Sequence, residues 1–202
     1  HLAWQSQRGL WSNSDLPPEE RVRPYSTRAG TLPAEGGAVF YLEERDAALA
    51  RGATILAEVT GYGQRFVTPG LDPDGSVRSD ALKATGVASP DWIAPTGLGR
   101  PDMDALEVKA FQDAYGDDLG GAAALLATPW IGFSGPATAP LQLAAGILAA
   151  RGELTPQRGV RGEPAPGCEA MATALTRSGR TGAGATLVAS CFSLDGVHAA
   201  VG

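Results

Sequence analysis

The stretch PDWIAPTGLGRPDMDALEVKAFQDAY, residues 90–115, organises this 202-residue chain. Residues 92–94 read as a short apolar strand, and residues 95–101 form a loop rich in Pro and Gly. An amphipathic helix then runs to Tyr115, with Gly116 just beyond it. Backbone N–H groups converge where a strand, a glycine loop and a helix N-terminus meet, and such places often hold oxyanions or phosphates. The sequence therefore predicts a candidate site at this loop.

Two carboxylates, Asp104 and Glu107, lie in the first turns of this helix. Acidic residues there complement the positive end of the helix dipole, which is the interpretation we favour. Paired carboxylates three residues apart could instead carry out acid/base chemistry or bind a metal. No His or third ligand lies nearby in the sequence to support that alternative.

Residues 91–111, DWIAPTGLGRPDMDALEVKAF, resemble without gaps the β-ketoacyl synthase loop D-Y/V-V-E-A-H-G-T-G-T-x-x-x-D-x-x-E-x-x-A. The matching positions are Asp91, Gly97, Gly99, Asp104 and Glu107. The catalytic histidine of that family falls on Thr96. A hydroxyl of ordinary acidity cannot replace imidazole as a donor and acceptor of protons near neutral pH. The resemblance therefore implies the scaffold of a ketosynthase without its imidazole.

A second resemblance lies in residues 130–157, WIGFSGPATAPLQLAAGILAARGELTPQ. Active ketosynthases carry a lysine and a second catalytic histidine here, but no Lys or His occurs between Lys109 and His198, and Pro136 takes the place of that histidine. The segment is similar to the chain-length-factor pattern T-G-R-x-x-S-G-x-x-P-L-D-x-x-A-A-x-L-A. The positions that match are Gly132, Pro140, Leu141, Ala145, Leu148 and Ala149, whereas Phe133 and Gln142 depart from it.

The C-terminal segment ATLVASCFSLDGVHAAVG, residues 185–202, predicts two apolar strands around a turn at Asp195-Gly196. It resembles the terminal A-x-x-N-S-F-G-F-G-G-x-N-A-x-x-V of the family. Phe192 and Gly196 keep their places, while the remaining glycine run is lost at positions 193–195. Cys191 and His198 could form a new nucleophile and base, but a thiol within an apolar strand usually packs inertly. His198 is then a satisfied strand histidine or an interface residue.

Periodicity predicts the other elements. We expect a short helix end at 2–10 and a polar loop at 12–28. We further expect buried strands at 39–43 and 54–62, and helices at 43–51, 76–85, 141–150 and 169–176.

Composition narrows the class of partner. The formal net charge is −6, which disfavours a nucleic-acid partner. No apolar run reaches the length needed to span a membrane, so we expect a soluble protein without a membrane partner. Cys168 and Cys191 form neither a disulfide framework nor a metal pattern and are compatible with the cytoplasm.

The resemblance implies an α/β, thiolase-like fold of α-β-α-β-α layers, of which the chain represents mainly the C-terminal half. Residues 1–38 would be the end of the N-terminal half and a connecting loop, and residues 39–202 the ketosynthase-like C-terminal half. The family's nucleophilic cysteine lies in the N-terminal half. A half alone would leave apolar surfaces without partners. We therefore expect that half upstream or on a separate chain.

The implied function is that of a catalytically silent, chain-length-factor-like subunit. It would form a heterodimer with an active ketosynthase and shape the tunnel in which a chain grows on phosphopantetheinylated acyl carrier protein by decarboxylative Claisen condensation. It would need no cofactor or metal of its own. Two alternatives stay open: a diverged active β-ketoacyl synthase or acyltransferase, and a structural scaffold subunit.

Overall fold

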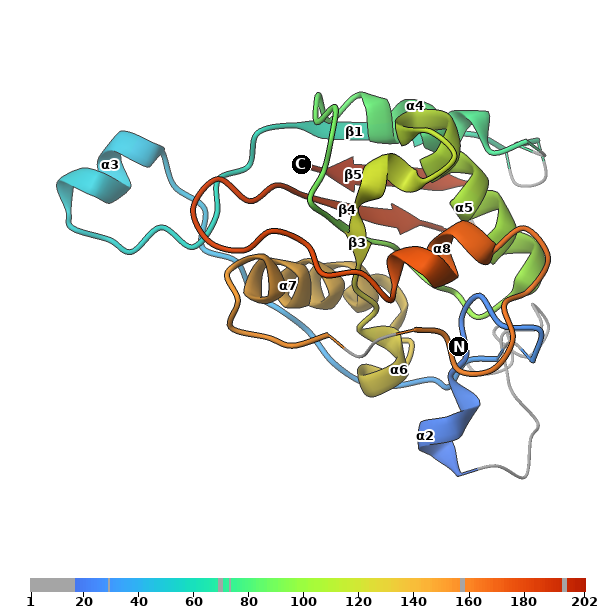
Figure 1. Cartoon of the computed structure of the whole chain (residues 1–202). Coiled ribbons are helices and arrows are strands. Elements are labelled where there is room, and N and C mark those ends of the chain that lie inside the picture. Colours follow the sequence, from blue (N-terminus) through green and yellow to red (C-terminus); the bar gives the residue numbers. More distant parts are fainter. Residues whose placement is uncertain (1–16, 29, 69–70, 73, 157–158, 194–195) are drawn as a thin grey trace.

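A five-stranded mixed sheet forms the centre of the computed structural model, which describes residues 17–28, 30–68, 71–72, 74–156, 159–193 and 196–202 (Figure 1). The strand order is β1-β5-β4-β2-β3. β1 pairs antiparallel with β5 and β5 with β4, whereas β4, β2 and β3 are parallel. The strands are β1 (Tyr62–Phe66), β2 (Trp92–Ala94), β3 (Ala123–Ala124), β4 (Leu187–Phe192) and β5 (Val197–Val201).

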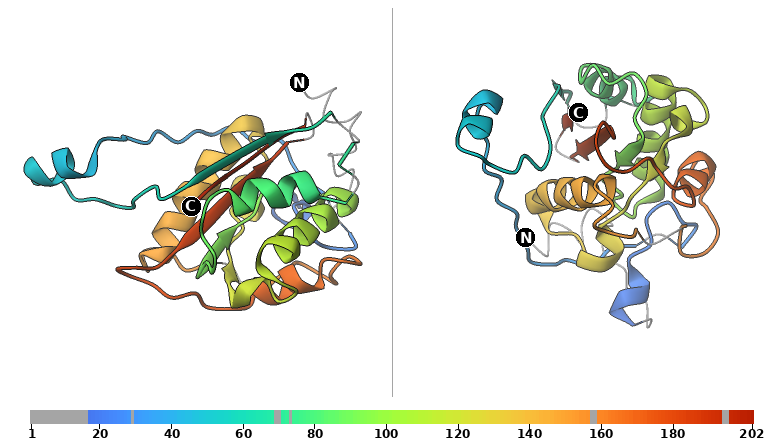
Figure 2. Two further views of the ribbon diagram at one scale, coloured as in Figure 1. Left: turned by 90° about the horizontal axis from the view of Figure 1, so that it is seen from above. Right: turned by 60° about the vertical axis from the view of Figure 1, so that its left-hand side comes forward.

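Helices lie on both faces of this sheet. Figure 2 shows α4 and α5 on one side and α7 on the other, where α7 packs against β4 and β2. None of the helices in the described ranges is long and apolar enough to cross a bilayer. The helices are α2 (Pro18–Arg21), α3 (Arg45–Ala50), α4 (Ser76–Lys83), α5 (Pro101–Tyr115), α6 (Thr128–Ile131), α7 (Thr138–Ala150) and α8 (Glu169–Ala174), with 3-10 turns η1 (Leu119–Gly121) and η2 (Gly135–Ala137).

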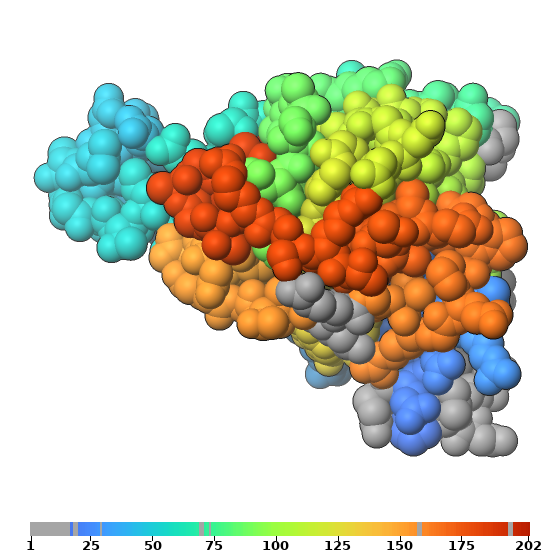
Figure 3. Space-filling view, in the orientation of Figure 1, coloured from blue at the N-terminus to red at the C-terminus, as the bar shows by residue number. Residues whose placement is uncertain are grey.

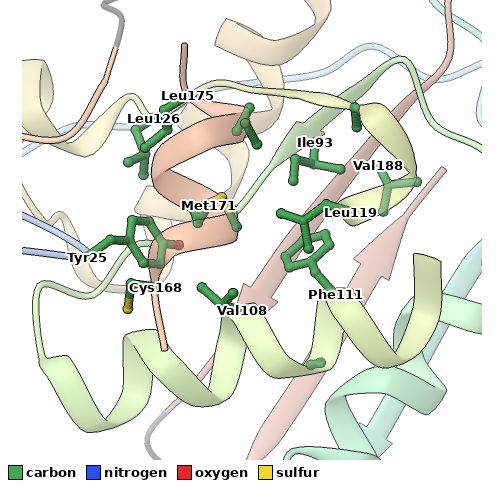
Figure 4. Close-up of a cluster of buried hydrophobic side chains, with 14 of the residues drawn as sticks. Tyr25, Ile93, Val108, Phe111, Leu119, Leu126, Cys168, Met171, Leu175 and Val188 are labelled. Carbon is green, nitrogen blue, oxygen red and sulfur yellow. The ribbon is translucent and has the colours of Figure 1, made fainter. Parts of the chain in front are cut away.

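The main core lies between the sheet, α5 and α8 (Figure 4). α5 begins with Pro101, whose missing N–H is not needed in a first turn, and ends at Tyr115, with Gly116 as its C-cap. Its apolar side chains Val108 and Phe111 are fully buried. They pack with buried residues of β2, β4, η1 and α8, namely Ile93, Val188, Leu119 and Met171. This packing fixes the N-terminal end of α5 next to the glycine loop.

Most of the predicted elements are confirmed. The helices expected at 43–51, 76–85, 141–150 and 169–176 correspond to α3, α4, α7 and α8, and the C-terminal hairpin corresponds to β4 and β5. The loop expected at 12–28 contains the four-residue α2. The helix end expected at 2–10 and the turn residues Leu194 and Asp195 lie outside the described residues.

Two strand predictions are wrong. Residues 39–43 form no strand, and the residues are exposed instead of buried. Of the strand expected at 54–62 only Tyr62 belongs to one, because β1 begins there and runs to Phe66. A strand requires a neighbour that accepts its backbone hydrogen bonds. Residues 39–43 and 54–59 pair with no strand in the described part of the chain, whereas Thr60 and Gly61 bond to the backbone of Gly202 beyond the end of β5.

A buried polar cluster lies between α4 and the sheet. Arg78 Nη1 contacts Asp72 Oδ2 at 2.5 Å, with 5% and 4% of the side chains exposed. His198 of β5 is 1% exposed, and its Nδ1 has no hydrogen-bond partner. Its ring meets that of Phe192 edge to face, and the Arg78 guanidinium lies 5.9 Å from the Phe192 ring centre. Burial, together with the nearby Arg78 charge, lowers the pKa of His198 to about 4, against an opposing effect of Asp72.

His198 should make the fold sensitive to acid. The pKa of His198 in the folded state lies below the ordinary 6.5. Its contribution to the free energy of unfolding is therefore complete above pH 6.5 and is lost as the pH falls towards 4. Between pH 6.5 and 4, the free energy of unfolding of wild type should fall by about 3 kcal/mol more than that of His198→Phe. Urea unfolding of both proteins across this range measures the difference. Parallel stability curves would contradict the prediction.

Candidate functional site

The loop after β2 requires its two glycines. Gly97 and Gly99 have φ of 57° and 71°, a region that side chains rarely tolerate. A Cβ on Gly97 would lie 2.4 Å from Leu126 Cδ2, and one on Gly99 would lie 2.4 Å from the carbonyl oxygen of Gly30. These two family positions therefore have a steric role in the packing of the loop.

Glu107 is the centre of the site. Its side chain is buried and accepts four hydrogen bonds, two on each carboxylate oxygen. Oε1 accepts from Thr96 N at 2.7 Å and from Ser190 Oγ at 2.9 Å. Oε2 accepts from Tyr25 Oη at 2.7 Å and from Gly97 N at 3.0 Å. One carboxylate thus joins the N-terminal segment, the glycine loop, α5 and β4.

Asp104 performs a similar role one turn earlier. Its oxygens accept from Tyr25 N at 2.8 Å and from Gly99 N at 3.1 Å. Burial raises the pKa of Asp104 to about 7; the Tyr25 amide lowers it and Glu107 raises it further. Tyr25 is itself fully buried with φ of 61°, and burial, followed by the charge of Glu107, raises the pKa of its phenol. The N-terminal segment is thereby fixed beside the loop.

These contacts change the interpretation of the loop. The amides of Thr96, Gly97 and Gly99, which the sequence offered to an external anion, bind the chain's own carboxylates. Asp104 and Glu107 contact loop amides and not only the dipole of their helix. No group of three or more His, Cys, Asp or Glu side chains placed to hold a metal occurs in the described ranges.

Thr96, at the position of the family histidine, has a structural role. Its Oγ1 accepts from Phe192 N at 2.9 Å and lies 3.4 Å from the carbonyl oxygen of Ser190, to which it can donate. Its side chain is buried. The hydroxyl therefore links the loop to β4, and both its donor and acceptor functions are in use.

The remaining family positions lie away from this network, except for Phe192, whose N–H donates to Thr96 Oγ1. Gly132 follows the last residue of α6, and Pro136 and Pro140 lie in η2 and α7. Gly132 has φ of 70°, and a Cβ on it would lie 2.7 Å from the Cβ of Ala34. Gly196, with φ of 87°, lies directly before β5. Phe192 is buried in the main core.

Strand register excludes the Cys191–His198 dyad. Cys191 pairs with Ala199 and Phe192 pairs with His198. Paired residues share a face of a sheet and neighbouring residues alternate, so Cys191 and His198 point to opposite faces. The interpretation of His198 as a buried strand histidine agrees with this register, although its Nδ1 has no partner.

Three residues of the site were missed by sequence reasoning. Tyr25 and Ser190 lie 82 and 83 positions from Glu107 and contact it only through the fold. Gln142, noted only as a departure from the family Asp, is buried; it accepts from Ala127 N at 2.7 Å and donates to the Leu125 carbonyl. A polar residue within an otherwise apolar helix was the one available signal for Gln142.

Asp104 should give a pH dependence opposite in sign to that of His198. The pKa of Asp104 in the folded state, about 7, exceeds the ordinary 3.8. Its contribution to the free energy of unfolding is therefore present below pH 3.8 and is lost as the pH rises through 7. Between pH 4 and 8, the free energy of unfolding of wild type should fall by up to about 4 kcal/mol relative to that of Asp104→Asn. Urea unfolding at each pH measures this. A wild type that gains stability relative to the variant as the pH rises would contradict the assignment.

The sequence and the structure were compared with those of known proteins. The tetracenomycin polyketide synthase ketoacyl synthase alpha subunit of Streptomyces glaucescens is 34% identical over 163 residues, which cover 75% of this chain and 38% of that protein. The structure of the ishigamide ketosynthase/chain length factor matches with a TM-score of 0.78 at 26% identity, over 98% of this chain and 49% of its own. No model of a known protein family matches the chain.

A third comparison concerns the fold alone. The structure is that of a type II polyketide synthase acyl-carrier protein in complex with its ketosynthase bound to the hexaketide. One chain of that complex matches with a TM-score of 0.79 at 21% identity, over 99% of this chain and 51% of the matching chain. The present chain thus spans about half the length of its structural neighbours. The expected α/β, thiolase-like fold is confirmed, and the chain belongs to the β-ketoacyl synthase superfamily.

Proposed function

We propose that the chain is part of a non-catalytic, chain-length-factor-like subunit of a type II polyketide ketosynthase. It acts in the cytoplasm, pairs with an active ketosynthase and shapes the cavity in which an acyl chain grows on acyl carrier protein. It has no cofactor of its own; the phosphopantetheine is carried by the carrier protein. The other half of the fold comes from an upstream segment or from a separate chain.

The observation that carries this proposal is the state of Thr96. A condensing enzyme requires a group at this position that can donate or accept a proton near the substrate. The hydroxyl of Thr96 is buried and already bonded to the backbone of β4 on both sides. The adjacent amides are equally committed to Glu107. The Thr96 hydroxyl and these two amides therefore maintain the shape of the loop, which supports a non-catalytic role.

The structural neighbours support a ketosynthase and an acyl carrier protein as the kinds of partner that we propose. One is a ketosynthase/chain length factor and another is a ketosynthase in complex with an acyl-carrier protein. A subunit without catalytic groups can still set product length, because the side chains that close a shared cavity limit the chain that fits.

The test is a reconstitution with three arms. The purified protein is incubated with malonyl-loaded acyl carrier protein alone, then together with the tetracenomycin ketoacyl synthase alpha subunit as a trial partner, and that subunit is also assayed alone. We expect no elongation by the protein alone and a product of defined length with the partner. Elongation by the protein alone would favour the diverged enzyme. A product unchanged by the presence of the protein would favour the scaffold.

A further inference from the structure

A cavity of about 300 Å³ lies beside the N-terminal segment of the described chain. Its walls come from distant parts of the sequence: residues 22–24, Leu126 and Pro129 after β3, residues 159–161 and Leu175 at the C-cap of α8. In Figure 3 the N-terminal segment, in blue, lies against the segment that contains residues 159–175, in orange. At about 30 Å³ per water molecule, the cavity has room for a ligand of about ten non-hydrogen atoms.

Hydrogen bonds between backbone groups fix these walls. Ala165 N donates to the Tyr25 carbonyl oxygen at 2.8 Å, which holds the N-terminal segment against the segment before α8. Gly159 N donates to the Leu175 carbonyl oxygen at 2.9 Å and closes the opposite side. Binding sites for small molecules are usually largely pre-formed, because the ordering of a loop upon binding costs affinity. The walls therefore need no rearrangement to receive a ligand.

Most of the lining is apolar. Val22, Leu126 and Leu175 are only 3%, 6% and 2% exposed. Leu126 and Leu175 also belong to the main core, and Figure 4 shows both at the same end of that cluster. A ligand that enters the cavity buries apolar surface, which favours a ligand with a hydrocarbon part. The apolar residues of the lining are Val22, Pro24, Leu126, Pro129, Val160 and Leu175.

The charged groups of the lining are two guanidinium groups. They belong to Arg23 and Arg161, and none of the described residues that line the cavity is acidic. The Arg23 side chain is 15% exposed, and its Nη2 lies 3.4 Å from Glu20 Oε2, near the upper limit for a hydrogen bond. The Glu20 side chain is 51% exposed, and ion pairs with so exposed a partner contribute little stability. A bound anion can therefore replace Glu20 beside Arg23.

The positive charge of the cavity contrasts with the charge of the whole chain. The sequence has 16 Lys and Arg against 22 Asp and Glu, which gives a formal net charge of −6. A general excess of basic residues therefore does not account for two arginines in one small cavity. Guanidinium groups bind phosphate and carboxylate through parallel N–H donors and are more weakly hydrated than ammonium groups. The lining as a whole thus matches an anion that is joined to an apolar group.

We infer that the cavity binds a small organic anion, in which a short hydrocarbon group contacts the apolar lining and a phosphate or carboxylate is held by Arg23 and Arg161. The two head groups share the chemistry that guanidinium recognises, and the experiment below distinguishes them. Binding joins the N-terminal segment to α8 and so stabilises the fold. The inference does not rest on the proposed function, because neither Thr96 nor Glu107 lines the cavity.

Methyl NMR of the 202-residue chain tests the inference. The methyl signals of Val22, Leu126, Val160 and Leu175 are followed while butyl phosphate, pentanoate, inorganic phosphate or butan-1-ol is added at constant ionic strength. We expect butyl phosphate or pentanoate to shift these signals with a Kd of about 1 mM, an ordinary affinity for a ligand of this size. Inorganic phosphate and butan-1-ol each provide only one of the two required groups and should bind at least about ten-fold more weakly.

Substitution of the two arginines locates the anion. Arg23→Met and Arg161→Met should each raise the Kd of the organic anion about ten-fold or more, because one of the two guanidinium groups is lost. Arg23→Lys should give an intermediate Kd, since it keeps the charge but not the parallel donors. Arg45→Met is the matched control: the Arg45 side chain on α3 is 61% exposed and pairs with Glu58, and the Kd should not change.

Urea unfolding provides a second readout that is independent of the methyl signals. With a Kd of about 1 mM, about 10 mM ligand should lower the unfolding equilibrium constant of wild type about ten-fold. Arg161→Met should lose this stabilisation, whereas Arg45→Met should keep it. The unfolding curves without ligand also show whether each variant is folded, and Arg161→Met decides the result if Arg23→Met is not.

Three outcomes would overturn the inference. Unchanged methyl signals with both organic anions, at concentrations well above the expected Kd, would make the cavity a solvent-filled crevice. Equal affinities for inorganic phosphate and butyl phosphate would reduce it to a positively charged surface. Equal weakening by Arg45→Met and Arg161→Met would show that the anion binds elsewhere. Tighter binding of butyl phosphate would identify the head group as phosphate and tighter binding of pentanoate as carboxylate, and either result supports the inference.

Discussion

Glu107→Ala is expected to lower the free energy of unfolding by about 4 kcal/mol, one of the two largest effects that we predict for a single substitution in this chain. The carboxylate accepts from Thr96 N, Gly97 N, Ser190 Oγ and Tyr25 Oη in a buried site. Removing it leaves these donors without an acceptor, and each unpaired buried group costs roughly 1–3 kcal/mol. Urea unfolding followed by circular dichroism measures the loss.

Two further variants separate this cause from simple loss of volume. Glu107→Gln keeps the shape but replaces one acceptor oxygen by a donor, so we expect an intermediate loss of about 2 kcal/mol. Glu35→Gln makes the same chemical change at an exposed position and should alter stability by less than about 0.5 kcal/mol. If Glu107→Ala were no more damaging than Glu35→Gln, the carboxylate would not hold the loop.

Asp72→Asn is expected to cost about 3–5 kcal/mol because it leaves the buried guanidinium of Arg78 without its counter-charge. Arg78 has few alternatives, since its Nε already lacks a partner. Asp72 Oδ1 also accepts from Val77 N at the start of α4, and Asn can preserve that bond. The loss therefore reports mainly on the ion pair and is measured by urea unfolding near neutral pH.

An exposed ion pair on α5 provides the control. Lys109 Nζ lies 3.0 Å from Asp113 Oδ2, and about half of the Lys109 side chain is exposed. Asp113→Asn should change stability by less than about 0.5 kcal/mol. The double variant Asp72→Ala/Arg78→Met, which removes both charges, should recover most of the loss. A similar small effect for Asp72→Asn and Asp113→Asn would show that Arg78 finds another counter-charge.

Local patterns predicted the helices well because their causes are local. Proline at the first position and glycine after the last determine the limits of α5, and apolar spacing determines which side of it is buried. The hairpin of β4 and β5 was equally readable, since both strands are apolar and adjacent in the sequence. The strand predictions at 39–43 and 54–59 failed because a strand exists only when another segment lies beside it.

The candidate site was only partly predictable. The glycines and the two carboxylates could be recognised from their spacing, but the direction in which those carboxylates point could not. Tyr25 reaches Glu107 from 82 positions away, and nothing in its own neighbourhood indicates that contact. The sequence indicated that the imidazole is missing at Thr96; only the structure placed the hydroxyl between Ser190 and Phe192.

The sequence by itself determined the superfamily, the helices, the glycine loop and the absence of its catalytic histidine, because these depend on residue identity and short-range spacing. Only the tertiary structure decided that Glu107 and Asp104 bind the loop amides, that Cys191 and His198 face opposite sides of the sheet, and that the apolar residues 39–42 are left exposed. The physical reason is that buried hydrogen bonds and strand pairing join distant segments, and their partners are fixed only when the chain is packed.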